Sequence, residues 1–165
     1  MRLLPDDLVQ AAEALLNACK ERGIMIATAE SCTGGLIAGC LTEVAGSSAV
    51  VDRGFVTYSN QAKSDMLGVP MDMIDSHGAV SENVAKAMAV GALAKSKAML
   101  TISVTGVAGP GGGSAEKPVG LVHFGSAMTK QPTLHQRHVF DGDRSDIRRE
   151  TVRTALRMLA DRLTN

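Results

Sequence analysis

The sequence predicts an α/β fold, a three-layer α/β/α sandwich around a mixed, mainly parallel sheet. Segments with helical spacing of apolar residues alternate with short strand-like runs for most of the chain, as in parallel sheets covered by helices. Two strand-like segments, 119–128 and 134–140, instead follow one another around Lys130-Gln131-Pro132. They predict a hairpin, so part of the sheet should be antiparallel. The 165 residues, 45% of them hydrophobic, suit a single domain over 1–165.

The first third of the chain should hold two helices and two strands. Apolar residues at helical spacing predict a helix over 8–19, and Gly23 suits its C-cap. The apolar run 24–27 predicts a buried strand. We expect a second helix to follow the small, polar segment 28–35 and to continue through Leu41. A loop over 45–49 and a strand over 50–58 should come next.

The remaining elements are justified in the same way. A short helix over 63–67 should stop at Gly68 and Pro70. Ser81 is a good N-cap for a helix whose apolar face is formed by Val84, Ala87, Met88, Gly91 and Ala92. The β-rich run 99–105 predicts a strand with Ile102 and Val104 on one face. After the hairpin, Asp143 should cap a last helix with the stripe Val152, Ala155, Leu156, Leu159 and Leu163.

Composition excludes several classes of function. Lys plus Arg and Asp plus Glu both number 17, which argues against partners such as duplex DNA or an anionic membrane. Aromatic residues make up 2%, too few for the stacking platforms of single-strand binders. No apolar run approaches a membrane span, and no signal peptide precedes Asp6 and Asp7. We therefore expect a cytoplasmic protein with no nucleic-acid or membrane partner.

The first segment that could carry chemistry is Thr28-Ala29-Glu30-Ser31-Cys32-Thr33-Gly34-Gly35, which follows a predicted strand and opens a predicted helix. A helix N-terminus offers unpaired N–H groups and partial positive charge, which can bind phosphate or stabilise an oxyanion. Ser31 would be positioned there as a nucleophile. The alternative is that Ser31 or Thr33 merely caps the helix. Cys32 is a rival nucleophile, although a buried, inert cysteine is more common.

The second segment is Tyr58-Ser59-Asn60-Gln61-Ala62-Lys63, at a strand-to-helix junction. A serine nucleophile needs a base, and no histidine stands out. A partly buried Lys63 could lose its proton near neutral pH, and Tyr58 could share hydrogen bonds with both groups. The alternative is a solvated lysine at a helix start beside a packing tyrosine.

The third segment, 105–113, is rich in glycine, which lets backbone N–H groups approach a ligand and form an anion-binding nest. It matches neither a P-loop nor a dinucleotide fingerprint. The alternative is a flexible surface loop. A metal site is not expected, because Cys19, Cys32 and Cys40 lack paired spacing, and His135 and His138 should face opposite sides of a strand.

Together these segments resemble the CinA C-terminal domain family. The family's motifs occur in order as T-A-E-S-C-T-G-G, V-T-Y-S-N-x-x-K with L-G-V, G-A-V-S-x-x-V-A, T-G-V-A-G-P-x-G-G with K-P-V-G, and F-x-G-D-R-x-x-I-R, from Thr28 to Arg148. Departures are small: Ala45 stands where proline is common, and 51–53 replace a more aromatic, glycine-rich run.

The resemblance implies a five-stranded mixed sheet and a stand-alone amidase that converts nicotinamide mononucleotide to nicotinate mononucleotide and ammonia in pyridine-nucleotide salvage, without a cofactor. It implies Ser31 as nucleophile, Lys63 as base and Tyr58 beside them. Substrate contacts are expected from two glycine-rich segments, at Thr33, Gly34, Gly35, Thr105, Gly106, Gly109, Gly111 and Gly112. The substrate phosphate would need one of these segments or an arginine.

Other functions stay open at this point. The chain could be a nucleotide-binding module without turnover, an amidase for another small carboxamide, or an adaptor related to competence. The expected partner is a small nucleotide, and the sequence leaves a homo-oligomer open.

Overall fold

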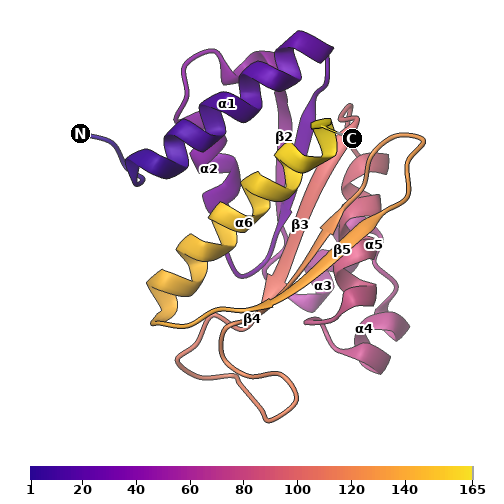
Figure 1. Cartoon of the computed structure of the whole chain (residues 1–165). Helices are drawn as coiled ribbons and strands as arrows, with labels where there is room; N and C mark the ends of the chain where they lie inside the picture. The colour runs from indigo at the N-terminus through magenta and orange to yellow at the C-terminus, as the bar shows by residue number, and fades with distance from the viewer. Residues whose placement is uncertain (165) are drawn as a thin grey trace.

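The computed structural model describes residues 1–164, which form one five-stranded sheet and the helices that cover it (Figure 1). The strands are β1 (Ile26–Glu30), β2 (Val51–Val56), β3 (Leu100–Gly106), β4 (Leu121–Ser126) and β5 (Leu134–Val139). The helices are α1 (Asp6–Arg22), α2 (Leu36–Thr42), α3 (Asn60–Leu67), α4 (Met71–His77), α5 (Glu82–Ala94) and α6 (Arg144–Thr164), with a 3-10 turn η1 (Ser47–Ala49).

The strand order is β2-β1-β3-β4-β5, and the sheet is mixed. Strand β1 pairs in parallel with β2 and β3, whereas β4 runs antiparallel to both β3 and β5. Four of the five strands therefore point the same way, which confirms the predicted mixed, mainly parallel sheet. The carboxyl ends of β2, β1 and β3 consequently meet at one edge of the sheet.

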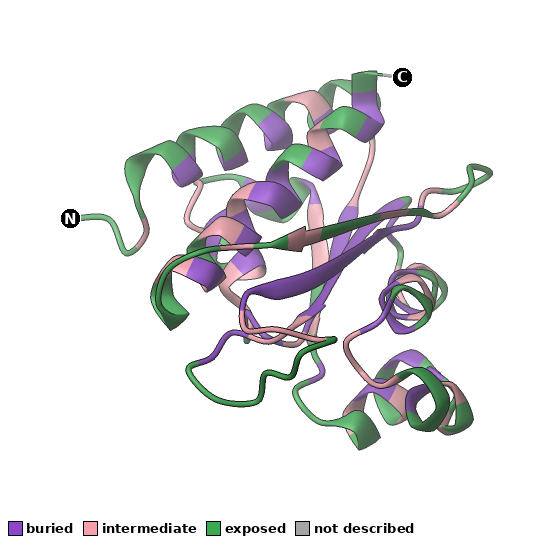
Figure 2. Cartoon of the chain, turned by 60° about the horizontal axis from the view of Figure 1, so that its bottom comes forward, coloured by how far each residue is buried: buried purple, intermediate pink, exposed green. Residues whose placement is uncertain are grey.

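Helices cover both faces of this sheet, as the predicted sandwich requires. Helices α1, α2 and α6 lie over one face, and α3, α4 and α5 lie over the other (Figure 1). Each side has its own hydrophobic core, the first including Leu8, Ile102 and Leu159 and the second including Leu67, Val84 and Met88. The inner strands β1, β3 and β4 are buried, while the edge strand β5 is largely exposed (Figure 2).

Helix α5 packs closely on the sheet through hydrogen bonds from alternate residues of β3. The hydroxyl groups of Thr101 and Ser103 donate to the carbonyl oxygens of Ala89 and Ala85, at 2.9 and 2.5 Å. Thr105, on the same face, donates to Ala79 just before the helix, at 2.8 Å. These bonds place the segment that precedes α5 against the carboxyl end of β3.

Most predicted elements are present, and several caps are confirmed. Gly23 ends α1 in a left-handed conformation, and the Ser81 hydroxyl accepts from the Val84 N–H at the start of α5. Asp143 and Asp146 form a reciprocal capping box at α6, each side chain accepting from the other's backbone N–H at 2.9 Å. The hairpin of β4 and β5 turns through Lys130, whose φ of 61° is left-handed.

Three details differ from the sequence prediction. Strand β1 extends to Glu30 rather than ending at Ala27, because strands on both sides pair with it over that length. Helix α3 begins at Asn60, not Lys63, because the Ser59 side chain caps it. Helix α4 was not predicted, since Ile74 is its only fully buried residue and no apolar stripe marks it. Within residues 1–164, no helix combines the length and apolar character needed to cross a bilayer.

Candidate active site

Ser31 lies directly beyond the end of β1, between the ends of the two neighbouring strands. Its backbone N–H donates to the carbonyl oxygen of Val104 in β3 at 3.1 Å. On the other side, the Thr57 N–H donates to the Glu30 carbonyl at 2.8 Å. In α/β proteins ligands bind at this edge, beyond the carboxyl ends of parallel strands. Ser31 is half-buried and sits in the middle of that edge.

A tight turn follows Ser31 before α2 begins. The Gly34 N–H donates to the Ser31 carbonyl at 3.0 Å, and Gly34 and Gly35 adopt left-handed φ values of 57° and 104°. Glycine adopts this conformation at little cost. Arg148 of α6 holds the turn from outside, donating to the carbonyl oxygens of Cys32 and Thr33 at 3.2 and 3.1 Å. Ser31 therefore belongs to a turn that is held by its own Gly34–Ser31 hydrogen bond and, from outside, by Arg148.

The N-terminus of α2 is not free for a ligand, which corrects the expectation for this segment. The buried Glu30 carboxylate accepts from the N–H groups of Ile37 and Ala38 at 2.8 and 3.0 Å, and from the Thr33 hydroxyl at 2.6 Å. A carboxylate satisfies the helix dipole as a phosphate would. The capping alternative is also wrong for both residues, because the N-cap position of α2 is Gly35 and the Glu30 carboxylate, not Ser31 or Thr33, accepts from N–H groups in the first turn of the helix.

Lys63 is buried beside Ser31. Its side-chain nitrogen donates to the Ser31 Oγ at 3.0 Å and to the Thr57 carbonyl at 3.0 Å, and the residue is only 2% exposed. The alternative of a solvated lysine is therefore wrong. Burial lowers the pKa of the Lys63 amine from its usual value, and the Cys32 thiol opposes this only as a lesser influence.

No carboxylate forms an ion pair with Lys63 within residues 1–164. Its two partners are a hydroxyl and a carbonyl oxygen, both neutral. Glu30, the nearest acidic residue in sequence to Ser31, is engaged at α2. No carboxylate of residues 1–164 therefore offsets the effect of burial on the pKa of Lys63. A buried lysine facing a serine hydroxyl is an arrangement that can activate a nucleophile.

Tyr58 lies at the same edge, but its hydroxyl does not bridge Ser31 and Lys63 as the sequence had suggested. It accepts from the Arg144 Nη2 at 3.0 Å, and Tyr58 is 60% exposed. Thr57, the residue before Tyr58, supplies the contact to Lys63 instead, through its backbone carbonyl.

The predicted substrate segment 105–113 divides into two parts. Thr105 and Gly106 end β3 beside Ser31, but the Thr105 hydroxyl is engaged with Ala79. Gly109 is buried, and its carbonyl accepts from Arg144 at 2.7 Å. The outer glycines, Gly111 and Gly112, are exposed. Thr105 and Gly106 therefore adjoin Ser31, whereas Gly111 and Gly112 lie on the surface.

Cys32 is a poor rival to Ser31. Its side chain is buried, and burial raises the pKa of the Cys32 thiol to about 12. The reactive form of cysteine is the thiolate, so a thiol that stays protonated at neutral pH is inert.

No histidine of residues 1–164 forms a hydrogen bond with Ser31 or Lys63. The His123 Nδ1 lies 2.8 Å from the His135 Nε2, and the His135 Nδ1 lies 3.1 Å from a Glu82 oxygen. His138 faces the opposite side and contacts Phe124 and Phe140. In the described part of the chain, no three His, Cys, Asp or Glu side chains are grouped as metal ligands.

Sequence reasoning missed two arginines of this site, Arg144 and Arg148. Both come from the start of α6, far along the chain from Ser31, and reach the site through packing. The only signal was their presence in the last quoted motif, F-x-G-D-R-x-x-I-R. Spacing alone could not place that motif beside the nucleophile.

The fold and the site define an α/β domain with a half-buried serine paired with a buried lysine at the carboxyl edge of its sheet. A family model for the CinA C-terminal domain matches residues 8–163, and the chain belongs to this family. It is 48% identical over 153 residues to the nicotinamide-nucleotide amidohydrolase PncC of Escherichia coli K12, covering 93% of each chain.

Solved structures agree with this assignment. The competence/damage inducible protein CihA of Agrobacterium tumefaciens superposes with a TM-score of 0.96 at 54% identity, covering all of both chains. The competence damage-inducible protein A of Klebsiella pneumoniae superposes with a TM-score of 0.92 at 37% identity, covering 96% of this chain and 98% of that one.

Proposed function

We propose that this chain hydrolyses the carboxamide of nicotinamide mononucleotide, with Ser31 as nucleophile and Lys63 as its base. One observation carries the mechanism: a buried lysine amine 3.0 Å from the hydroxyl of a serine at the carboxyl edge of the sheet. The substrate is proposed from the relative in Escherichia coli, which is named for nicotinamide-nucleotide amidohydrolysis. The products would be nicotinate mononucleotide and ammonia, as in pyridine-nucleotide salvage.

In the first half of the reaction, the neutral Lys63 amine accepts the proton of the Ser31 hydroxyl as Oγ attacks the carboxamide carbon. One N–H of Lys63 keeps its bond to the Thr57 carbonyl, which orients the nitrogen lone pair toward Ser31. Collapse of the tetrahedral intermediate breaks the carbon–nitrogen bond. Lys63 returns the proton to the departing nitrogen, and ammonia leaves an ester on Ser31.

In the second half, water attacks the same carbon while Lys63 accepts one of its protons. The carbon–oxygen bond to Ser31 breaks, and Lys63 returns the proton to Oγ. The product leaves as a carboxylic acid, which gives its remaining proton to solvent and becomes the carboxylate. The base ends each half in the state in which it began, so no other proton carrier is needed. No cofactor takes part in these steps.

The negative oxygen that develops on the carboxamide would be held by the turn after Ser31. The N–H groups of Cys32 and Thr33 directly follow the nucleophile, and neither donates to a backbone carbonyl oxygen among residues 1–164. Fixed N–H donors at such a place stabilise tetrahedral intermediates of acyl transfer. Glu30 and Arg148 bind the turn from other parts of the fold and would keep these N–H groups in place.

The test is a product assay on the purified chain. We expect release of ammonia and nicotinate mononucleotide from nicotinamide mononucleotide, and far less from free nicotinamide. The Ser31→Ala variant prepared in parallel controls for contaminating amidases. Absence of ammonia from the parent chain with both substrates would reject the proposal, and preference for free nicotinamide would reject its substrate.

A further inference from the structure

Arg144 forms a bridge across the edge of the sheet that carries Ser31. Its Nη2 donates to the Tyr58 hydroxyl at 3.0 Å, and its Nη1 donates to the Gly109 carbonyl at 2.7 Å. Tyr58 follows β2 and Gly109 follows β3, whereas Ser31 follows β1, which lies between these two strands. The guanidinium therefore joins the two segments that flank the nucleophile.

The contact between Arg144 and Gly109 depends on a backbone conformation that favours glycine. Its φ of 79° is left-handed, and a Cβ placed there would lie 2.5 Å from a methyl group of Val119. A side chain at this position would therefore be strained and would collide with Val119. The buried carbonyl of Gly109 is thus presented to Arg144 by a conformation that favours glycine.

The charge of Arg144 is not compensated by any carboxylate of residues 1–164. Its two partners, a phenol and a carbonyl, are neutral, and the neighbouring Asp143 and Asp146 bind each other's backbone. A guanidinium has five N–H donors, so two bonds leave three. Arg144 is exposed, so these donors are open to solvent or to a ligand.

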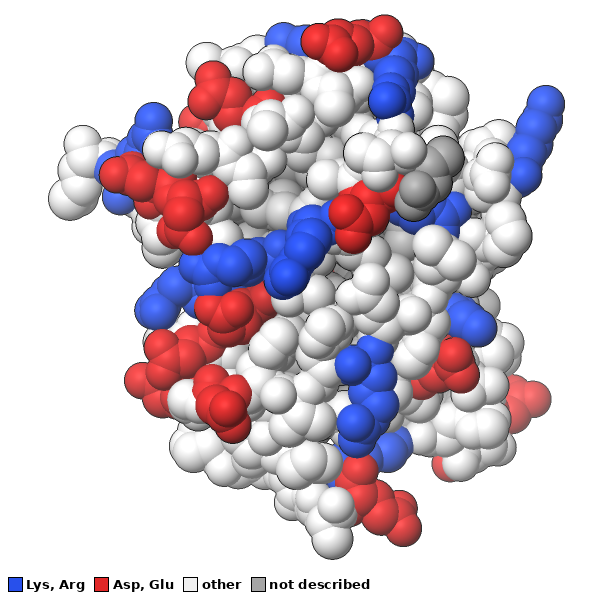
Figure 3. All heavy atoms as spheres, viewed as in Figure 1, with Lys and Arg blue, Asp and Glu red and all other residues white. Residues whose placement is uncertain are grey.

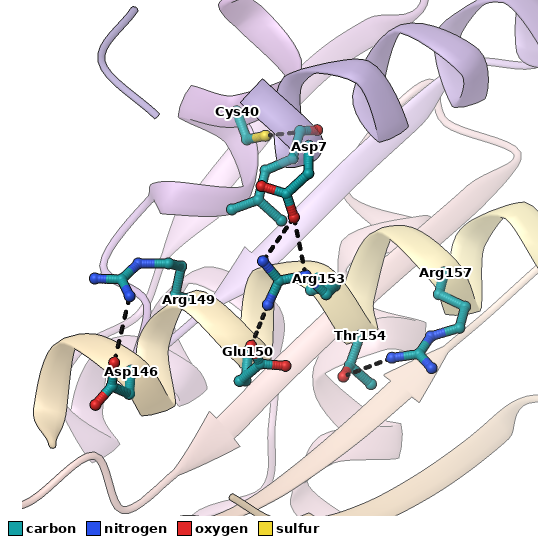
Figure 4. A network of polar contacts seen from close by, with 9 residues as sticks. Asp7, Cys40, Asp146, Arg149, Glu150, Arg153, Thr154 and Arg157 are labelled. Atoms are coloured by element: carbon teal, nitrogen blue, oxygen red, sulfur yellow. Dashed lines mark hydrogen bonds and ion pairs between the residues drawn. The ribbon is translucent and has the colours of Figure 1, made fainter. Parts of the chain in front are cut away.

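Two other arginines of α6, Arg149 and Arg153, are paired with carboxylates, although basic side chains form a visible band over that helix (Figure 3). Arg149 pairs with Asp146 at 3.3 Å, and Arg153 pairs with Asp7 at 2.7 Å and with Glu150 (Figure 4). Arg148 donates to the carbonyl oxygens of Cys32 and Thr33 in the turn after Ser31. Arg144 differs from these three because it has no carboxylate partner among residues 1–164 and it joins the two segments that flank the strand carrying Ser31.

A hollow of about 480 Å³ adjoins the bridge and has room for part of a nucleotide. Arg144 lines it together with Ala108, Pro110, Val119 and Ser145. Asp143 is the one acidic side chain on its wall, and its carboxylate is occupied as the cap of α6.

We propose that Arg144 is the residue that recognises the phosphate monoester of the substrate and so selects a nucleotide over a nucleoside. This inference rests on the proposed function. Arginine binds phosphate through paired N–H donors and a charge that persists at any physiological pH. Because Tyr58 and Gly109 already hold the guanidinium, little conformational freedom is lost when a phosphate binds. Arg144 contributes binding, and the bond-breaking steps remain with Ser31 and Lys63.

The test measures binding without turnover. In the Ser31→Ala chain, calorimetry would compare nicotinamide mononucleotide with nicotinamide riboside, which lacks only the phosphate. We expect the mononucleotide to bind more tightly. Adding Arg144→Gln should lower the affinity for the mononucleotide about 10–100-fold (about 1.4–2.8 kcal/mol). The affinity for the riboside should change less than about threefold. Arg144→Lys should recover part of the loss, because it retains the charge without the fork.

Arg149→Gln is the matched control, since Arg149 lies in the same helix but is paired with Asp146. It should leave both affinities unchanged. Three results would overturn the inference. Arg144→Gln could lower the affinity for both ligands equally, or lower neither. The Ser31→Ala chain with Arg144 intact could also bind the two ligands equally well. Failure of the wild-type chain to release ammonia would reject the proposed function alone, because the binding contrast does not depend on turnover.

Discussion

The side-chain nitrogen of Lys63 lies 3.0 Å from the hydroxyl oxygen of Ser31, although the two residues are 32 positions apart in the chain. Each comes from its own βα connection, Ser31 after β1 and Lys63 in the first turns of α3 after β2. Parallel pairing of β1 with β2 brings these connections together. The contact is therefore a direct product of the sheet topology.

Ser31→Ala should abolish most turnover and leave the fold intact. Its side chain accepts a hydrogen bond from Lys63 but caps no helix, so little stability depends on it. Cys32→Ala should retain substantial activity, because the buried Cys32 thiol stays protonated. Ammonia release by the two purified variants, with circular dichroism to check folding, measures this. An inactive Cys32→Ala beside an active Ser31→Ala would contradict the assignment of the nucleophile.

Glu30→Gln should lower both stability and the rate. The amide has one acceptor oxygen, whereas the carboxylate uses two oxygens to accept from Thr33, Ile37 and Ala38. Losing a charged hydrogen-bond partner costs about 1.5–3 kcal/mol, which should lower the melting temperature by roughly 3–12 °C. Glu21→Gln, at an exposed position of α1, is the control. An unchanged melting temperature in Glu30→Gln would show that the carboxylate does not hold the turn.

The contact between His123 and His135 should make stability depend on pH. Burial, helped by His135, Arg137 and Lys117, lowers the pKa of His123 to about 4 in the folded chain, although Glu82 opposes the shift. The unfolded chain binds this proton near pH 6.5. Stability from this residue is therefore full above about pH 6.5 and is lost as the pH falls toward about 4, by up to about 3 kcal/mol.

Urea unfolding between pH 4 and 7 measures that loss. His123→Gln should flatten the slope relative to wild type, and His77→Gln, at an exposed position, should not. Identical slopes for wild type and His123→Gln would contradict this account of the pair.

The fold was predictable because its elements carry strong local signals. Ser81 and Asp143 mark helix starts, and the stripe on α6 marks its buried face. The missed helix α4 and the short prediction for β1 have the opposite cause. Helix α4 buries only Ile74 fully, and β1 contains Thr28 and Glu30, which are buried because β2 and β3 flank them.

The site was predictable in part. Ser31 and Lys63 lie in short motifs whose chemistry can be read locally. The engagement of Glu30 with α2 and of Arg144 with Tyr58 could not be read in this way, because each depends on the direction of a side chain across the fold. The role first given to Tyr58, between Ser31 and Lys63, failed for the same reason.

The most direct test of the Ser31–Lys63 mechanism is the pH dependence of kcat/KM in wild type, Lys63→Arg and Lys63→Met. Burial lowers the pKa of Lys63, so its neutral form should become accessible as the pH rises through the assay range. The wild-type rate should therefore increase with pH along one ionisation limb. Arginine keeps the charge but cannot act as a base.

Both variants should lose that limb, and their rates should fall by about 10²–10⁴-fold, the usual contribution of general-base catalysis. Circular dichroism would establish that each variant is folded. A folded Lys63→Arg enzyme that keeps more than about a tenth of the wild-type rate, with the same pH profile, would contradict Lys63 as the base.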